Sequence, residues 1–361
     1  MSAAREARMT VDIVDAERET NGGALARRRL PSGPKAAAAR PSRAKWAPAD
    51  AEPDLLQPLG DQLVISCGHS ILLSDLCGQL GAAAGGFFHF QSRFLKRAEL
   101  RIAGRMVQGE PATASCDRIA SRALVKLPRS SLARAERDAP DPSLEVQSEH
   151  QVRDGLTLRY RITNRSAQRI KTSISWRLSA DFVDQGKSNT LKGLPRVGVA
   201  RRWSAPATLL LTSLHPRLRH ASRVRFSGPE AFRSAGDRVF SVLHLEPQAE
   251  CVVELELTPL FDPAYAAELP DRPDADNAKP WQDGCSQLIA ASPAVQAAWD
   301  AAASDLRTLQ LGDGQGEERF TPAAGIPHYL ALFGRDALMS GWQTSLLNPA
   351  TMRGALSLVG R

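Results

Sequence analysis

The chain has few cysteines and no paired cysteine motif. Its five cysteines are odd in number, widely separated and never in a CxxC arrangement. A disulfide framework needs paired cysteines and a zinc site needs closely spaced ligands, so the sequence favours neither. The histidines are not at ligand spacing either. We therefore expect no metal, no cofactor and a reducing, cytoplasmic setting.

Long apolar runs are also missing. No apolar stretch approaches the roughly 20 residues that a transmembrane helix needs. The first 30 residues contain five acidic residues and lack the apolar core of about 7 to 15 residues that defines a secretory signal. We therefore expect a soluble protein with no membrane partner.

Aromatic residues make up only 6% of the chain and do not alternate with a basic stripe. The net charge is +7, but residues 1–50 hold ten Lys or Arg and six Asp or Glu and so supply +4 of it. The remainder is close to neutral, so we expect no nucleic-acid partner. Residues 1–53 are rich in Arg, Ala and Pro, which predicts a disordered tail. An RNA- or membrane-contacting arm is the less favoured alternative for its arginines.

Residues 54–260 show an apolar period close to two, in short runs separated by Gly, Pro, Asp and Asn. This pattern predicts an N-terminal domain that is a large antiparallel β-sandwich. The clearest pair of strands, Leu156–Ile162 and Ile170–Leu178, flanks a polar turn and is predicted to form a β-hairpin. Further strands are predicted over residues 63–66, 71–74, 100–103, 144–152, 207–212, 239–245 and 251–257.

Residues 261–284 are rich in Pro and Asp and predict a linker. Beyond it, Ser292-Pro293 predicts a helix start, Asp336–Leu346 a second helix and Asn348-Pro349 the start of a third. The fold class is therefore mainly β with a C-terminal α segment. Three helices over residues 285–361 cannot close a barrel by themselves, so their apolar faces must lie on the sandwich, on a partner or on further sequence.

Several motifs resemble the glycogen debranching, amylo-α-1,6-glucosidase family. Ala324–Asp336, read as AGIPHYLALFGRD, resembles the AGIPW-like stretch and FGRD that open the family's catalytic barrel. Gly86–Leu95 and Ala180–Asp184 are similar to the family's GLY…DTRFLS and ADFAD segments. The resemblance implies an N-terminal sandwich domain followed by the first helices of an (α/α)6 barrel, with an α-glucan or oligosaccharide as substrate.

By this likeness, Arg335 and Asp336 would hold the hydroxyls of a terminal glucose, with Tyr329 and His328 lining the same subsite. An ion pair at a helix start is the structural alternative for the first two residues, and packing is the alternative for the other two. The chain departs from the family where Gln91-Ser92 replace Asp-Thr, where His328 replaces tryptophan, and after Asp184.

Glycoside hydrolysis needs two carboxyl groups, and none after residue 300 matches the family's acid or base. Glu317 and Glu318 follow a glycine-rich loop and are expected to be solvated. We therefore name no catalytic residue and expect the chain to be inactive alone, either as a truncated enzyme or as a piece that a partner chain completes. The alternative function is a non-catalytic carbohydrate-binding or assembly module.

Overall fold

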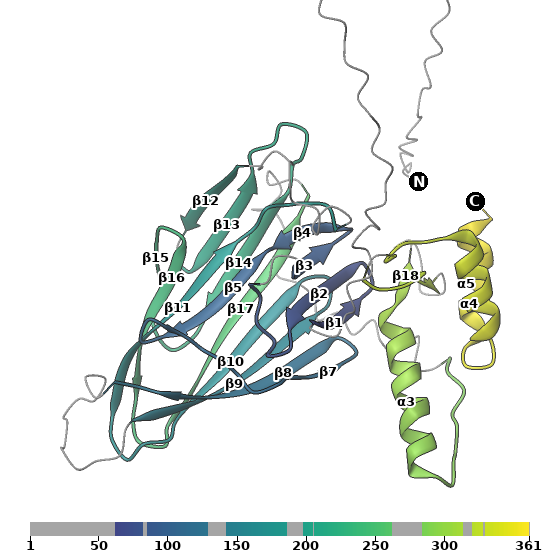
Figure 1. Cartoon of the computed structure of the whole chain (residues 1–361). Coiled ribbons are helices and arrows are strands. Elements are labelled where there is room, and N and C mark those ends of the chain that lie inside the picture. The colour runs from purple at the N-terminus through teal and green to yellow at the C-terminus, as the bar shows by residue number, and fades with distance from the viewer. Residues whose placement is uncertain are drawn as a thin grey trace, which may run out of the picture. The chain divides into compact units, whose positions relative to one another are not determined.

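The computed structural model describes residues 62–81, 85–128, 142–185, 198–204, 206–261, 284–312, 320–327 and 329–360 (Figure 1). The predicted tail lies outside these residues, as does nearly all of the predicted linker. The strands are β1 (Gln62–Cys67), β2 (Ser70–Asp75), β3 (Gly86–His89), β4 (Ser92–Leu95), β5 (Arg97–Ile102), β6 (Arg105–Met106), β7 (Thr113–Ser115), β8 (Arg118–Lys126), β9 (Ser143–Val152), β10 (Leu156–Asn164), β11 (Ile170–Ser179), β12 (Val199–Ser204), β13 (Thr208–Ser213), β14 (Ala221–Ser227), β15 (Arg233–Ala235), β16 (Arg238–Leu245), β17 (Glu250–Leu260), β18 (Gln310–Gly312) and β19 (Phe320–Pro322).

The strands form two large antiparallel sheets and two small ones. The eight-stranded sheet has the order β12-β13-β14-β17-β10-β9-β8-β7, and the five-stranded sheet has the order β15-β16-β11-β5-β6. A four-stranded sheet, β1-β2-β3-β4, and a two-stranded sheet, β18-β19, complete the set. All the pairings are antiparallel, which confirms the predicted mainly β sandwich.

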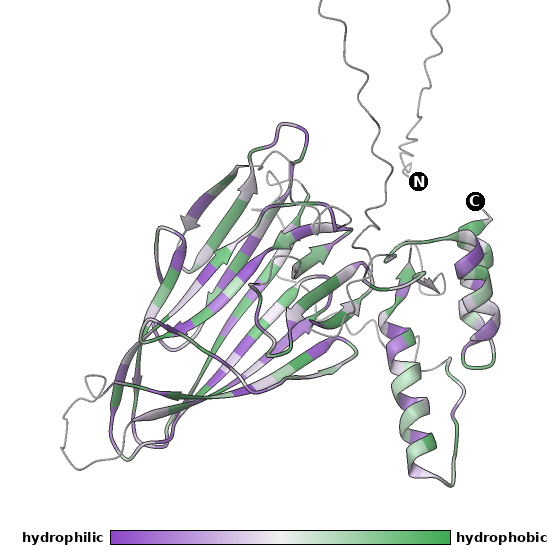
Figure 2. Cartoon of the chain, in the orientation of Figure 1, coloured by the Kyte–Doolittle hydropathy of each residue, from purple (hydrophilic) through white to green (hydrophobic). Residues whose placement is uncertain are grey.

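One large apolar core fills the space between the eight-stranded and five-stranded sheets. Tyr160 of β10 and Trp176 of β11 are both buried there, with ring centroids 5.8 Å apart. Phe226 of β14 contacts the same tryptophan from the eight-stranded sheet. Apolar and polar residues alternate along the strands, as the alternating colours of Figure 2 show, because successive side chains point to opposite faces.

The predicted hairpin between β10 and β11 is wrong. β10 pairs with β9 and β17, whereas β11 pairs with β5 and β16 in the other sheet. Asn164 stabilises the connection by which the chain passes from one sheet to the other. Its Nδ2 donates to Leu245 O and Glu246 O, and its Oδ1 accepts from Ser166 N. A hairpin and a crossing between sheets both bury alternate residues, so the apolar period could not separate them.

Three helices follow the sandwich, and residues 284–360 are termed the helical segment. They are α3 (Pro293–Thr308), α4 (Gly334–Gln343) and α5 (Pro349–Val359), where the sequence predicted them. Asn348 caps α5 by accepting a hydrogen bond from Ala350 N, and Ser292 is the N-cap residue of α3. These helices confirm the predicted C-terminal α segment. Their place at the start of an (α/α)6 barrel stays a prediction.

The helical segment packs on the four-stranded sheet through a second, small core. Its sandwich side consists of Ile71, Leu73 and Phe88, and its other side of Leu311, Ala323 and Leu330. Gly68 N also donates to Thr308 O, at the end of α3. The small core therefore fixes β18, β19 and the chain that follows them against the sandwich.

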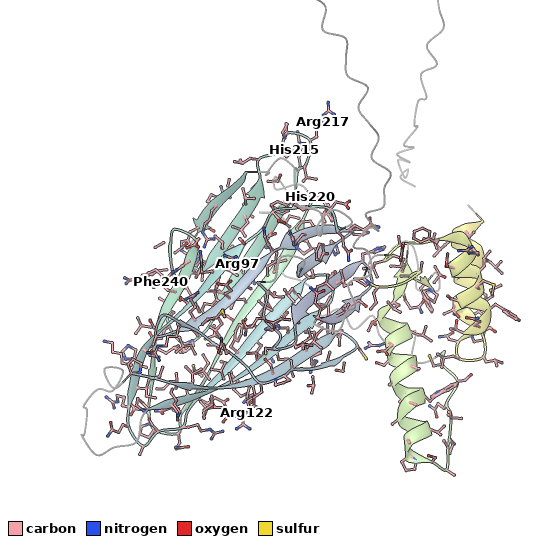
Figure 3. The ribbon with its side chains drawn as sticks, in the orientation of Figure 1. Arg97, Arg122, His215, Arg217, His220 and Phe240 are labelled. Atoms are coloured by element: carbon pink, nitrogen blue, oxygen red, sulfur yellow. The ribbon has the colours of Figure 1, made fainter. Side chains whose placement is uncertain are left out.

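The outer face of the eight-stranded sheet carries cross-strand ion pairs. Arg159 bonds Glu254 at 2.6 Å, Arg161 bonds Glu250 at 2.6 Å, and Arg122, labelled in Figure 3, bonds Glu145 at 2.8 Å. Hydrogen bonds from Gln147 and from the arginines lower the pKa of Glu145 to about 2. This face is therefore largely neutralised by its own side chains.

Candidate functional site

A short loop over Gly325–Tyr329, termed the subsite loop, follows β19. Gly325 N donates to Tyr329 O and Tyr329 N donates to Gly325 O, both at 3.1 Å, and these bonds close the loop. Ala324 N donates to Ala331 O at 3.2 Å and extends the same antiparallel pairing. Pro327 is buried within the loop, and the Ile326-Pro327 peptide is cis. The loop is thus a closed unit held by its own backbone.

Tyr329 links the subsite loop to the start of α4. Its side chain is 62% exposed, and its ring meets that of Phe333 edge to face at 6.0 Å between centroids. Phe333 is the residue before the helix and is itself exposed. Both rings are exposed, and Phe333 precedes Arg335 and Asp336 in the sequence by two and three positions. The sequence interpretation missed Phe333, although its position four residues after Tyr329 was visible in the motif.

Arg335 and Asp336 occupy the first turn of α4. Arg335 is exposed and Asp336 is partly buried. In the described part of the chain, neither side chain forms an ion pair or hydrogen bond, while Asp336 lies in the first turn of α4, where the helix-start alternative also places it. A free carboxylate can accept two hydroxyl hydrogen bonds and a free guanidinium can donate several. Their polar atoms are therefore available to a ligand.

Two other predicted groups cannot be placed. His328, expected to line the subsite, lies outside the described residues, and so do Glu317 and Glu318. From residue 300 onward, the side-chain carboxylates that the structure describes are Asp300 and Asp305, both exposed on α3, and Asp336. Of the four candidates, Tyr329, Arg335 and Asp336 lie within the described residues, and the ring of Tyr329 contacts that of Phe333, the residue before α4.

Several large apolar side chains of α4, of α5 and of the turn between them are exposed. Trp342 is 65% exposed and Leu346 is 84% exposed, and Met339 and Leu356 are also exposed. In Figure 2 the ribbons of these two helices carry both hydrophobic and hydrophilic residues. Exposed apolar side chains that form a contiguous patch are typical of an interaction site.

Two hollows lie elsewhere on the protein. One, of about 400 Å³, lies along α3 and is lined by Trp299, Asp300 and Arg307. The other, of about 420 Å³, lies over β8, β9 and β10 and is lined by Arg122, Arg159 and other side chains of the ion-paired face. Neither includes Tyr329, Arg335 or Asp336.

The described residues contain no group of three or more His, Cys, Asp or Glu side chains arranged to hold a metal ion. Within the same part of the chain, none of the helices combines the length and apolar character needed to cross a bilayer.

The fold defines the chain as an antiparallel β-sandwich protein continued by a helical segment. Residues 65–256, more than half of the chain, match the sequence model of the N-terminal domain of some glycogen debranching enzymes. The chain therefore belongs to this family. The matched region extends from β1 into β17 and ends before α3.

Solved structures resemble the chain more distantly. A kojibiose phosphorylase candidate from the human microbiome has 11% sequence identity and a TM-score of 0.44, and the match covers 72% of this chain and 40% of that one. A galactose mutarotase-like protein from Clostridium acetobutylicum has 6% identity and a TM-score of 0.32, over 55% of this chain and 95% of that one. A galactose mutarotase-like protein from Lactobacillus casei has 8% identity and a TM-score of 0.31, over 55% and 100%. No curated protein matches the sequence. The family assignment rests on the sequence model.

Proposed function

We propose that the chain is the N-terminal portion of a glycogen-debranching-type glycoside hydrolase similar to amylo-α-1,6-glucosidases. It contacts a terminal glucose of an α-glucan through Arg335 and Asp336, with Tyr329 and His328 beside them. The observation that carries this proposal is the absence of any protein partner for the two charged side chains within the described residues. Membership in the debranching family supplies the class of ligand.

The chemistry of a glucose unit suits these groups. Its hydroxyls both donate and accept hydrogen bonds, so Asp336 accepts from two of them while Arg335 donates to others. Tyr329 contributes an exposed ring face and a phenolic hydroxyl, which suits a ligand with one apolar face and a polar rim. The start of α4 adds backbone N–H groups that have no partner within the helix.

A non-catalytic carbohydrate-binding or assembly module is the second candidate. The exposed side chains of Trp342 in α4 and of Leu346 between α4 and α5 favour a module whose apolar side chains are buried against a partner. Sugar binding by itself fits both candidates, and only the first predicts turnover once further chain completes the barrel.

Calorimetric titration with maltose and isomaltose tests the proposed subsite. Asp336→Asn should weaken binding by about 1 to 3 kcal/mol, the scale of a hydrogen bond to a charged group, and leave the fold intact. Asp305→Asn, the same change at an exposed position of α3, is the matched control and should leave affinity unchanged. Unchanged affinity in Asp336→Asn with a lowered melting temperature would make Asp336 a helix-start residue only.

A further inference from the structure

The side chain of Gln185 connects the sandwich to the subsite loop. Its Nε2 donates a hydrogen bond to the carbonyl oxygen of Pro327, 142 positions further along the chain. Gln185 is 3% exposed and Pro327 is buried, so the contact is shielded from water. Because proline has no N–H group, this carbonyl is its only backbone hydrogen-bonding group, and a buried carbonyl without a partner is destabilising.

We infer that Gln185 is a positioning residue for the glucose subsite: it holds the subsite loop, and with it Tyr329 and the start of α4, in the orientation that sugar binding requires. This inference rests on the proposed function and assigns the sandwich domain a part in it. Gln185 itself need not touch the sugar.

The backbone of Gln185 is fixed from the sandwich side. Gln185 N donates to Gln91 O at 2.7 Å, and the neighbouring Asp184 forms a β-bridge with Ser92. Gln91 lies in the turn between β3 and β4, where Phe90 and Gln91 have φ angles of 43° and 66°. Non-glycine residues rarely adopt this left-handed conformation. In this conformation of the turn, the Gln91 carbonyl accepts the hydrogen bond from Gln185 N.

The contact is specific for an amide. The Pro327 oxygen can only accept, so the nitrogen of the Gln185 side chain must face it. Glutamate has the same shape but, when ionised, offers only acceptor oxygens and would repel the carbonyl. Burial raises the pKa of such a carboxyl group, so acid would restore an O–H donor. Leucine is similar in size and has no donor at any pH.

These differences give a test that combines two variants with two pH values. The full chain is compared with Gln185→Glu and Gln185→Leu at pH 7.5 and about pH 5. The measurements are hydrogen exchange at the amides of residues 325, 326 and 329–331, and titration with maltose and isomaltose. Exchange is expressed as protection factors relative to the unchanged protein at the same pH. Gln248→Glu, in the exposed turn between β16 and β17, is the matched control.

At pH 7.5 we expect Gln185→Glu to lower both loop protection and sugar affinity by about tenfold or more. Near pH 5 both should recover, while Gln185→Leu stays weak at both pH values and Gln248→Glu matches the unchanged protein. A variant that had simply misfolded would not recover on acidification. Loop protection and affinity within about twofold of the unchanged protein in both Gln185 variants at pH 7.5 would overturn the inference.

The two proposals fail in different ways. If the unchanged protein binds neither sugar, the proposed subsite is wrong, and loop protection alone still decides whether Gln185 holds the loop. If the sugar binds and the Gln185 variants bind it equally well, the subsite stands and the positioning role is wrong.

Discussion

The fully buried guanidinium of Arg93 forms a bidentate ion pair with the carboxylate of Asp181. Nε and Nη2 donate to the two carboxylate oxygens at 2.8 and 2.6 Å, and Nη1 donates to Gly85 O at 3.1 Å. The backbones of the same segments also pair, since Arg93 N donates to Val183 O and Phe182 N donates to Arg93 O. The ion pair thus joins β4 to the chain that leads to Gln185.

Asp181→Asn should destabilise the sandwich by about 3 to 5 kcal/mol, because it removes the charged carboxylate that bonds the buried guanidinium through both of its oxygens. Asp237→Asn breaks the exposed Arg177–Asp237 pair and should cost about 1 kcal/mol or less. Urea unfolding followed by tryptophan fluorescence measures both. Equal losses in the two variants would mean that the burial of Arg93 does not govern the cost.

Purified protein should release no glucose from panose or limit dextrin above a no-enzyme control. The reason is that no carboxyl pair after residue 300 matches the family's acid and base, and acid–base catalysis contributes roughly 10²- to 10⁴-fold to the rate. A coupled glucose assay checks this. Turnover abolished by Glu317→Gln or Glu318→Gln would show that these residues are catalytic.

Gly354→Ala should destabilise the helical segment. A Cβ at this position of α5 would lie 2.0 Å from the carbonyl oxygen of Phe320 in β19, so the helix and the strand would have to separate. We expect a loss of about 1 to 3 kcal/mol despite the higher helix propensity of alanine. Gly341→Ala is the control, because its closest contacts are 3.2 Å away. Denaturant melts that ranked Gly341→Ala as the more harmful change would refute the steric argument.

His150→Phe should flatten the dependence of stability on pH. Burial lowers the pKa of His150 from its ordinary 6.5 to about 4, and within the described residues neither ring nitrogen has a hydrogen-bond partner. Between these pH values the unfolded chain binds a proton that the folded protein does not. Stability therefore falls as the pH drops through this window, by up to about 1.4 kcal/mol per pH unit.

The measurement for His150 is urea unfolding at pH 7, 5.5 and 4.5. His244→Phe, at an exposed position of β16, should retain the slope of the unchanged protein. Glu145, with its lowered pKa of about 2, adds a further loss below about pH 4.5 in every variant and cancels in the comparison. An unchanged slope in His150→Phe would place the titrating group elsewhere.

Much of the fold follows from residue patterns. The apolar alternation located β9, β10 and β11, and Asn348-Pro349 located the start of α5. β8 was missed because small residues, Ser121 and Ala123, occupy part of its inward face and weaken the pattern. The apolar alternation could not predict which strands pair, because a period of two residues is the same whichever sheet a strand joins.

The candidate site followed from the motif rather than from physical pattern. Arg335 and Asp336 were found because FGRD resembles a known segment, and only the coordinates could show that neither has a partner among the residues that the structure describes. Gln185 could not be found as a contact of Pro327, because side-chain contacts between such distant positions leave no local signal. The resemblance did mark the segments of Arg93 and Asp181, but not that they bond each other.

The small core that packs the helical segment against the four-stranded sheet contains far fewer residues than the main core of the sandwich. A part of a protein held by so few buried side chains can open by itself while the rest stays folded. Sugar bound at the start of α4 would hold that part closed, in proportion to the ligand concentration divided by its dissociation constant. Slowed cleavage of the helical segment by a protease would then report ligands that bind too weakly for direct titration.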